Sequence, residues 1–428
     1  MGDSRMDTLI ERKISMNKDQ KILRIPPKVP RPTPAPFALS PVVSEIEGAL
    51  EEGSLELMAA EQRLDDLLQR GTPLIEDIPG SEHERIVTFL DKDAQAMNVL
   101  LFINRITDET NLEQSLMKPV GQTSFRALSL RMRSDWRASY CLLRQNRGER
   151  APWQSPENQL QLRAALDRGQ LDSANPHRCV SNEGHLLSLL ELGDAPYQPF
   201  VTDAQPEALI WRESKSSRKF SAHLMGEVHA NLPLVIVLDG EKWAQQGLLS
   251  MAREAVKSGY LEDFLLVMVH SGGYAQRWEE LDGSFPYADF LADEVIPEAI
   301  ASLGVQSYGN AIVVGQSLGG LSAILAVWQR PEVFSAAVSS SASLWLETMQ
   351  VEFDRVSKNP EILDRYSPKL LLEVGEQEWV LLPLHQKFAE NLKRSGFDYE
   401  FHTYNGGHDF ACWRGSILPR LRKCFKTS

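Results

Sequence analysis

The chain has 428 residues, of which 43% are hydrophobic and 24% charged, the balance of an ordinary globular protein of about two or three domains. The absence of any run of about 18 apolar residues excludes a membrane-spanning helix. The net charge of −13 argues against nucleic acid as a partner, because phosphate binding needs a clustered basic face. Four widely spaced cysteines and a polar N-terminus without the apolar core of a secretory signal predict a cytoplasmic protein with reduced thiols.

The N-terminal part begins with a polar segment, followed by a helical one. Residues 1–38 end in the run PPKVPRPTPAP, whose prolines prevent regular pairing, so we expect a flexible tail with an extended end. Apolar residues then recur at helical spacing over residues 41–70, and Ser44 is a candidate N-cap.

A β-rich region comes next. Four runs of strand-forming residues over 83–145, separated by turn-prone stretches, predict a small antiparallel sandwich. Residues 150–200 are rich in Pro, Asn and Asp and predict a long irregular segment, which in a compact protein is usually functional or packed over another domain. We interpret residues 39–200 as a helix and an all-β sandwich domain with a linker, serving as a substrate-binding or lid domain.

Residues 201–428 have a different pattern, in which buried strands alternate with helices. An edge hairpin is expected over 207–225, and the nearly continuous apolar run at 232–240 is typical of a strand covered on both faces. The alternation predicts right-handed crossovers and a mostly parallel central sheet, which is the α/β class.

The strongest chemical signal is the G-x-S-x-G motif at Gly315–Gly319. It lies between an apolar strand, Ala311–Val314, and a helix that runs to Arg330. This strand–turn–helix context is the one a nucleophile elbow requires, with small residues on both sides of the strained serine. The sequence therefore predicts Ser317 as the nucleophile, against the alternative of a structural glycine turn.

A serine nucleophile needs a general base to remove its proton. In proteins with such an elbow, the order along the chain is serine, then acid, then histidine, so the base is expected last. Of the three later histidines, His385 falls in a helical pattern and His402 in a strand pattern. His408 follows the last strand, in a glycine-containing loop, where folds commonly mount catalytic groups. We therefore expect His408 to be the base.

The acid should follow the preceding strand, which ends at Gly375. Glu378 lies three residues beyond this glycine, where its carboxylate could turn back to the imidazole. Glu376 and Glu373 remain alternatives, whereas Asp409, adjacent to the histidine, is interpreted as structural.

An oxyanion hole requires two backbone N–H groups. One is expected from Leu318, the residue after the nucleophile. The other is expected from the loop after the first buried strand, where Gly240 would allow a close approach of the backbone.

These residues stand in longer motifs that resemble one family. The motifs are LDGEKWA, RWEEL at 277–281, GQSLGGLSA, LEVGEQE and GGHDFACWRG, together with SDWRASYC and LDSANPHR in the N-terminal half. They resemble the enterobactin (enterochelin) esterases, the two-domain cytoplasmic iron-siderophore esterases of the esterase D group of α/β-hydrolases. The resemblance covers about residues 60–428.

The resemblance implies an α/β-hydrolase domain preceded by an all-β sandwich that helps to bind the ligand. The substrate would be a cyclic tri-ester of catecholoyl-serine, ferric or free, and the triad would be Ser317, Glu378 and His408. Arg277 matches a family arginine of the substrate cleft, and Tyr287 stands where the family often has an asparagine. No cofactor or metal site on the protein is implied, since iron would arrive with the siderophore.

A ferric tris-catecholate is an anion with aromatic rims, so its pocket should offer arginines and flat side chains. For each candidate the structural alternative is core packing or an ion pair. The candidates are Arg277, Arg137, Trp136, Trp345, Trp379, Trp413 and Arg414.

The sequence thus predicts a serine esterase that opens a siderophore trilactone inside the cell, with this small molecule as its partner. One alternative is an esterase D-type hydrolase of another ester. A second is a non-catalytic siderophore-binding protein, against which the presence of Ser317, His408 and an acid argues.

Overall fold

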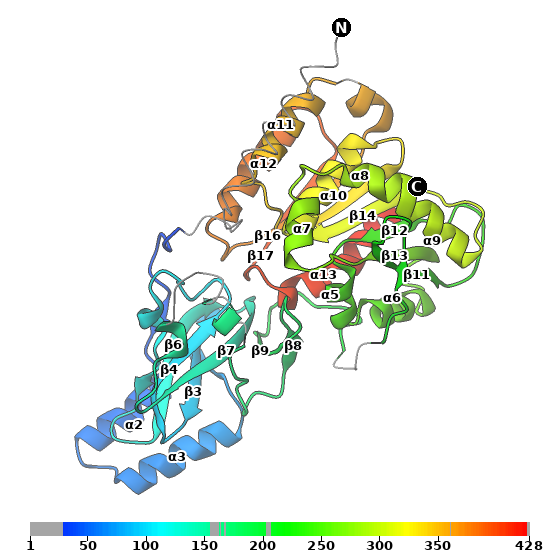
Figure 1. Cartoon of the computed structure of the whole chain (residues 1–428). Coiled ribbons are helices and arrows are strands. Elements are labelled where there is room, and N and C mark those ends of the chain that lie inside the picture. The colour runs from blue at the N-terminus through cyan, green and yellow to red at the C-terminus, as the bar shows by residue number, and fades with distance from the viewer. Residues whose placement is uncertain are drawn as a thin grey trace.

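The computed structural model describes residues 29–154, 162, 164–166, 168–202, 207–359 and 361–425 (Figure 1). Of the tail that the sequence predicts to be flexible, residues 1–28 lie outside the described part of the chain. Residues 29–38 are extended, as expected, but they are bound to the protein. Strand β1 (Phe37–Ala38) pairs antiparallel with Ser129 and Leu130, which explains why this end of the segment is ordered.

The N-terminal domain is a sandwich of two antiparallel sheets, in which β3, β4, β6 and β7 match the four predicted runs and the other strands were not predicted. One sheet has the order β1-β6-β3-β2, with β5 beside β6, and the other has the order β4-β7-β9-β8. The remaining strands are β2 (Leu74–Ile78), β3 (Ser81–Lys92), β4 (Ala96–Ile103), β5 (Lys118–Pro119), β6 (Phe125–Arg133), β7 (Arg137–Asn146), β8 (Arg178–Val180) and β9 (Leu186–Glu191). Alternate residues of both sheets form one core, including Phe89, Leu130, Leu101 and Tyr140.

Two helices cover the outer face of the first sheet, where one helical stretch was predicted. They are α2 (Pro41–Glu51) and α3 (Leu57–Gln69), interrupted near Gly53, whose φ of +68° favours glycine. The N-cap of α2 is Ser40, not Ser44, because the Ser40 hydroxyl accepts a hydrogen bond from the N–H of Val43 at 3.2 Å.

The segment 150–200 is more ordered than the sequence predicts. Strands β8 and β9 form a hairpin that completes the second sheet, and this hairpin reaches the other domain through a small core of Cys179, Leu189 and Ala411 (Figure 1). The segment contains many polar and proline residues, so its sequence pattern does not reveal the two short strands. Their apolar side chains pack across the domain boundary.

The second domain contains an eight-stranded sheet with the order β10-β11-β13-β12-β14-β15-β16-β17. Strand β11 is antiparallel to its neighbours, and the pairs from β13 to β17 are all parallel. This order and direction confirm the predicted α/β-hydrolase fold. The strands are β10 (Arg212–Glu213), β11 (Lys219–Met225), β12 (Leu234–Val237), β13 (Phe264–Val269), β14 (Ala311–Gln316), β15 (Phe334–Ser340), β16 (Lys369–Gly375) and β17 (Tyr399–Tyr404).

Helices cover both faces of this sheet, so alternate strand residues belong to two separate cores. The helices are α5 (Gly240–Gln245), α6 (Leu248–Lys257), α7 (Tyr274–Leu281), α8 (Tyr287–Phe290), α9 (Ile296–Leu303), α10 (Leu318–Gln329), α11 (Glu347–Val356), α12 (Leu381–Arg394) and α13 (Phe410–Phe425). Short helical turns are η1 (Leu112–Ser115), η2 (Pro152–Gln154), η3 (Leu291–Val295) and η4 (Glu361–Tyr366). No helix of the described residues is long and apolar enough to cross a membrane.

The carboxyl ends of the parallel strands position the site. The loops after β12, β14, β16 and β17 all leave the sheet at this edge, because parallel strands end on the same side. The residues that the sequence selects separately are therefore brought together here.

Candidate active site

Ser317 occupies a strained turn between β14 and α10. Its φ of 57° and ψ of −119° are unusual for a residue with a side chain, and its N–H donates to the carbonyl of Ser340 at 2.9 Å. A Cβ at Gly315 would overlap the carbonyl of Gly319, so this sharp turn requires a glycine. The geometry is that of a nucleophile elbow, which exposes the hydroxyl at the sheet edge.

Glu378 and His408 are joined by a direct hydrogen bond. His408 Nδ1 lies 2.7 Å from Glu378 Oε2, and the glutamate side chain is almost wholly buried. The second carboxylate oxygen accepts from the Gly375 N–H at 2.9 Å and from the Ser341 hydroxyl at 2.5 Å. These donors hold the carboxylate in the orientation that fixes the imidazole tautomer.

The environment of Glu378 keeps it ionised. Burial by itself raises the pKa of a carboxyl group, but His408 and its hydrogen bond, with Arg105 and Ser341, more than offset this and lower the pKa of Glu378 to about 2. The carboxylate is therefore negative at neutral pH, as an acid that supports a histidine base must be.

The alternative acids are engaged elsewhere. Glu376 pairs with Arg133 at 2.8 Å and accepts from the Thr403 hydroxyl at 3.1 Å. Glu373 is buried against α13, where Arg420 lies 2.8 Å from it.

Asp409 and the two other histidines are also engaged in other contacts, although Asp409 lines the same cavity as Ser317. Asp409 accepts from the backbone N–H of Ser139 at 2.7 Å and so joins the two domains. His385 is buried in α12, with Nδ1 2.9 Å from the Leu381 carbonyl, and its pKa is lowered mainly by burial. His402 is exposed on β17 and lies 3.4 Å from Glu400.

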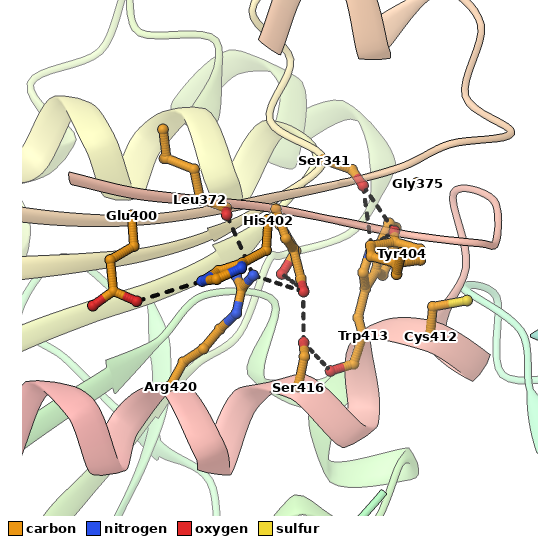
Figure 2. A network of polar contacts seen from close by, with 12 residues as sticks. Ser341, Leu372, Gly375, Glu400, His402, Tyr404, Cys412, Trp413, Ser416 and Arg420 are labelled. Carbon is orange, nitrogen blue, oxygen red and sulfur yellow. Dashed lines mark hydrogen bonds and ion pairs between the residues drawn. The ribbon is translucent and has the colours of Figure 1, made fainter. Parts of the chain in front are cut away.

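Figure 2 shows contacts of the C-terminal helix α13 with residues of β16 and β17 and with Ser341, which follows β15. The Trp413 indole N–H lies 2.9 Å from the Tyr404 hydroxyl and 3.2 Å from Ser341, which in turn donates to Glu378. Nearby, Ser416 donates to Glu373 at 2.6 Å. The sequence analysis did not predict this helix. Its Trp413 also packs edge-on against the His408 ring, with ring centroids 4.8 Å apart.

The two predicted oxyanion residues begin the helices α10 and α5. First-turn N–H groups have no acceptor within their own helix, so Leu318 and Gly240 are suited to donate to an oxyanion. Gly240 packs tightly, since a Cβ there would lie 2.8 Å from the backbone of Met268.

Asp239 links the oxyanion loop to the elbow. It adopts a left-handed conformation with φ of 56°, and its carboxylate accepts from Arg277 at 2.6 and 2.7 Å and from the Gln316 amide at 2.9 Å. Gln316 precedes the nucleophile and also accepts from the Trp243 indole at 2.8 Å. Burial raises the pKa of Asp239, but the charge and hydrogen bonds of Arg277, with Lys242 and His270, together lower it below its usual value, so this buried pair is ionic.

A cavity of about 80 Å³ lies beside Ser317 and His408, which both line it. Residues of the N-terminal domain line it as well, and the sequence analysis named none of them as site residues. The lining residues from that domain are Phe102, Asn104, Ser139, Tyr140, Cys141, Leu166, Ser181, Asn182 and Leu187. Ser139, Tyr140 and Cys141 belong to the SDWRASYC motif, whereas no local pattern marks the others.

Two of the predicted substrate-binding residues, Arg277 and Trp413, line this cavity. Arg277 differs from the expectation, because its guanidinium is paired with Asp239 and its side chain is only 12% exposed. Trp413 is buried, and its N–H group is used within the protein.

The other predicted substrate-binding residues lie outside the cavity lining and have partners of their own. Arg137 is buried and donates to Glu191 at 2.7 Å, and Arg414 is buried with Nε 3.4 Å from Gln198. Trp345 packs on Trp278, with centroids 6.1 Å apart.

Three further aromatic residues from the sequence analysis also lie outside the lining. Trp379 donates to the Val29 carbonyl at 2.9 Å, and Trp136 is wholly buried in the sandwich. Tyr287 is buried in a core of the α/β domain.

The fold and these contacts define a serine hydrolase of the α/β-hydrolase class. The described residues contain no group of three or more His, Cys, Asp or Glu side chains that could hold a metal ion.

Comparison with known proteins agrees with this class. The family model described as putative esterase matches residues 215–424, and the model described as enterochelin esterase, N-terminal, matches residues 86–201. An iron(III) enterobactin esterase of Escherichia coli is 27% identical over 387 residues, which cover 84% of this chain and 92% of the relative. An iron(III) salmochelin esterase of the same species is 26% identical and covers 82% of this chain and 90% of its own length.

Solved structures share the whole architecture. The enterobactin esterase of Shigella flexneri, crystallised in the presence of enterobactin, has a TM-score of 0.68 and 25% identity, over 84% of this chain and 97% of that one. The ferric enterobactin esterase of Salmonella typhimurium has a TM-score of 0.70 at 24% identity, over 85% of this chain and 99% of that one, and so supports the fold. The chain belongs to the enterobactin esterase family.

The Ser317→Ala variant tests the nucleophile. We expect kcat to fall by a factor on the order of 10⁴ or more, because binding without a nucleophile leaves little catalysis. The melting temperature should change little, because the hydroxyl is not part of the core. A variant with wild-type ester turnover would contradict the assignment.

A second set of variants tests the acid. We expect His408→Ala to lower kcat by a factor on the order of 10⁶ and Glu378→Gln by a smaller factor, about 10⁴, because the orienting acid contributes less than the base. Glu376→Gln is the matched control and should leave kcat within about a factor of three, because its partly exposed ion pair is worth little. If Glu376→Gln were the harmful change, the acid would be misassigned.

Stability against pH tests the ionisation of Glu378. Its folded pKa of about 2 lies below the ordinary 4.5, so its contribution to the free energy of unfolding is present above pH 4.5 and is lost as pH falls toward 2. In urea unfolding, the difference between wild type and Glu378→Gln should be constant above about pH 5.5 and shrink at lower pH. A difference that is unchanged down to about pH 2.5 would be inconsistent with the lowered pKa.

Proposed function

We propose that the protein is a serine esterase that hydrolyses the ester bonds of a catecholate siderophore trilactone of the enterobactin type. The observation that carries the proposal is that His408, which is hydrogen-bonded to Glu378, lines one cavity together with Ser317 and residues of a second domain. The names of relatives that align over more than four-fifths of the chain support the choice of substrate.

In the first half of the reaction, Ser317 Oγ attacks an ester carbonyl of the bound lactone. His408 takes the hydroxyl proton, and Glu378 stabilises the imidazolium that forms. The N–H groups of Leu318 and Gly240 are assigned to the negative oxygen of the tetrahedral intermediate. His408 then gives its proton to the leaving serine hydroxyl of the ring, which opens the lactone and leaves an acyl-enzyme.

In the second half, water replaces the leaving alcohol. His408 removes a proton from this water, which attacks the acyl group on Ser317. His408 then returns the proton to Ser317 Oγ as the bond between Oγ and the acyl carbon breaks, and the linear acid is released. Every proton is carried by His408, so the proposed reaction requires no protein-bound cofactor. Iron, where present, enters and leaves as cargo of the siderophore.

The cavity would take the reacting ester rather than the whole ligand. Sites that enclose an entire ligand typically hold about 300–1,000 Å³, whereas this cavity holds about 80 Å³. Aromatic side chains from both domains line it, among them Phe102, Tyr140 and Trp413, but all three are buried and offer little surface to a catechol ring. The choice of the small-molecule siderophore as partner is therefore supported by the names of the relatives rather than by the volume of the cavity.

A second candidate is hydrolysis of a less charged ester, including the iron-free siderophore. It is favoured by the charge of the cavity, because Arg277 is the one arginine or lysine among the described lining residues and Asp239 neutralises it. A highly anionic ferric complex would gain little from such a pair.

We also propose a cytoplasmic location, where release of iron from a siderophore would be used. The four cysteines are buried thiols outside any disulfide, as expected in a reducing compartment.

The test is incubation of the purified protein with enterobactin, with and without ferric iron, and separation of the products by chromatography and mass spectrometry. We expect linear trimer, dimer and monomer of dihydroxybenzoyl-serine, and none of them from the Ser317→Ala control. A faster reaction without iron would favour the less charged substrate. Hydrolysis of a p-nitrophenyl ester without cleavage of enterobactin would retain the esterase and reject the siderophore.

A further inference from the structure

The loop that carries His408 is held by the other domain. Two glycines, Gly406 and Gly407, precede the histidine, and such residues leave a backbone free to move. Asn104, which follows β4 of the sandwich, donates its amide to the backbone carbonyl of His408 at 3.1 Å. A Cβ at Gly407 would lie 2.5 Å from Asn104 Oδ1, so the two segments are in close contact.

The start of β7 holds the same loop from its other side. The backbone N–H of Arg137 donates to the carbonyl of Asn405 at 3.1 Å, and the N–H of Ser139 donates to Asp409 at 2.7 Å. The sandwich therefore contacts the loop before, at and after His408.

The loop that carries Glu378 is reached by the segment before β1. Arg31 donates to the Gln377 side chain at 3.2 Å and lies over the Trp379 ring, 5.3 Å from its centroid. Trp379 returns a hydrogen bond to the Val29 carbonyl at 2.9 Å. The catalytic acid thus stands between two residues that are bound by Val29–Arg31.

Arg31 also ties this segment to the turn that begins at Asn104. Its guanidinium donates to the carbonyl of Arg105 at 2.8 Å, and its backbone N–H donates to Asp108 at 3.0 Å. Gln377 completes the link, because its N–H donates to the Gly406 carbonyl at 3.0 Å. One turn of the sandwich therefore supports both triad loops.

We propose that Asn104 and Arg31 are positioning residues, and that the N-terminal domain holds Glu378 and His408 in register with Ser317 in addition to any contact with substrate. Catalysis is sensitive to such support, because a displacement of about 1 Å can cost about 100-fold in rate. The inference rests on the triad of the proposed function but is independent of the siderophore. A domain that only binds substrate would not affect the reaction of Ser317 with a small reagent.

The test uses a fluorophosphonate, which Ser317 attacks with loss of fluoride, and p-nitrophenyl acetate as a small ester. We expect Asn104→Ala and Arg31→Ala to lower the rate of phosphonylation and kcat for the small ester about tenfold, within the range that misplacement allows. Asn104→Asp keeps the size of the side chain but loses the donor, so it should be no better than Asn104→Ala. With enterobactin the loss in Arg31→Ala should fall on kcat, with KM within about a factor of two, because Arg31, unlike Asn104, lies outside the cavity lining.

Two matched controls separate positioning from a general loss of a contact. Asn98→Ala removes a half-buried amide from β4, the strand that precedes Asn104. This amide donates to Gln145 at 2.8 Å, in a part of the sandwich away from the catalytic loops. Arg63→Ala breaks an exposed ion pair with Glu45. Both controls should react at the wild-type rate and unfold cooperatively, as should the test variants.

The outcomes are distinct. Unchanged phosphonylation in Asn104→Ala and Arg31→Ala would overturn the inference while leaving the esterase intact. Wild-type protein that reacts at Ser317 but does not cleave enterobactin would reject only the substrate. If Asn104→Ala does not fold, Arg31→Ala carries the test alone, because Arg31 is outside all the cores and half-buried.

Discussion

The site depends on a single buried hydrogen bond, between Glu378 and His408. A carboxylate taken out of water is costly unless its oxygens are paired. Here the Gly375 N–H, the Ser341 hydroxyl and the imidazole supply that pairing, so that the pKa of Glu378 lies at about 2 despite burial. The donors come from the ends of different strands. The carboxylate is thus ionised and oriented only when the sheet is assembled around it, which links catalysis to folding.

Two other buried carboxylates near Ser317 are likewise paired with donors. Asp239 is buried beneath the oxyanion loop and accepts from Arg277 and Gln316, while Glu373 is buried behind the triad and pairs with Arg420 of α13. Such buried pairs contribute little net stability, but removal of one partner leaves a costly unpaired charge. They therefore fix the loops at the carboxyl edge in one arrangement rather than make the fold more stable.

The two domains form a common site. The sandwich lines the cavity, and its turn from Asn104 contacts the loop of His408 directly and is linked to the loop of Glu378 through Arg31, while the hairpin of β8 and β9 packs on Ala411 of α13. A lid that opens freely would break these contacts. The role of this domain in binding substrate or as a lid stays a prediction, and its contacts describe a wall of the site that is shared with the catalytic domain.

The sequence by itself determined the α/β class, the sandwich, the elbow at Ser317 and the position of His408 after the last strand, because strand periodicity and glycine spacing are local patterns. It ranked Glu378 above Glu376 because Glu378 lies three residues beyond Gly375. Only the tertiary structure placed its carboxylate within hydrogen-bond distance of the His408 imidazole. Only the tertiary structure decided that Arg277 is neutralised by Asp239 and that Trp379 is covered by Val29–Arg31. The reason is physical: whether a charged or aromatic side chain faces a ligand or a protein partner depends on residues far away in the chain, and no local pattern records them.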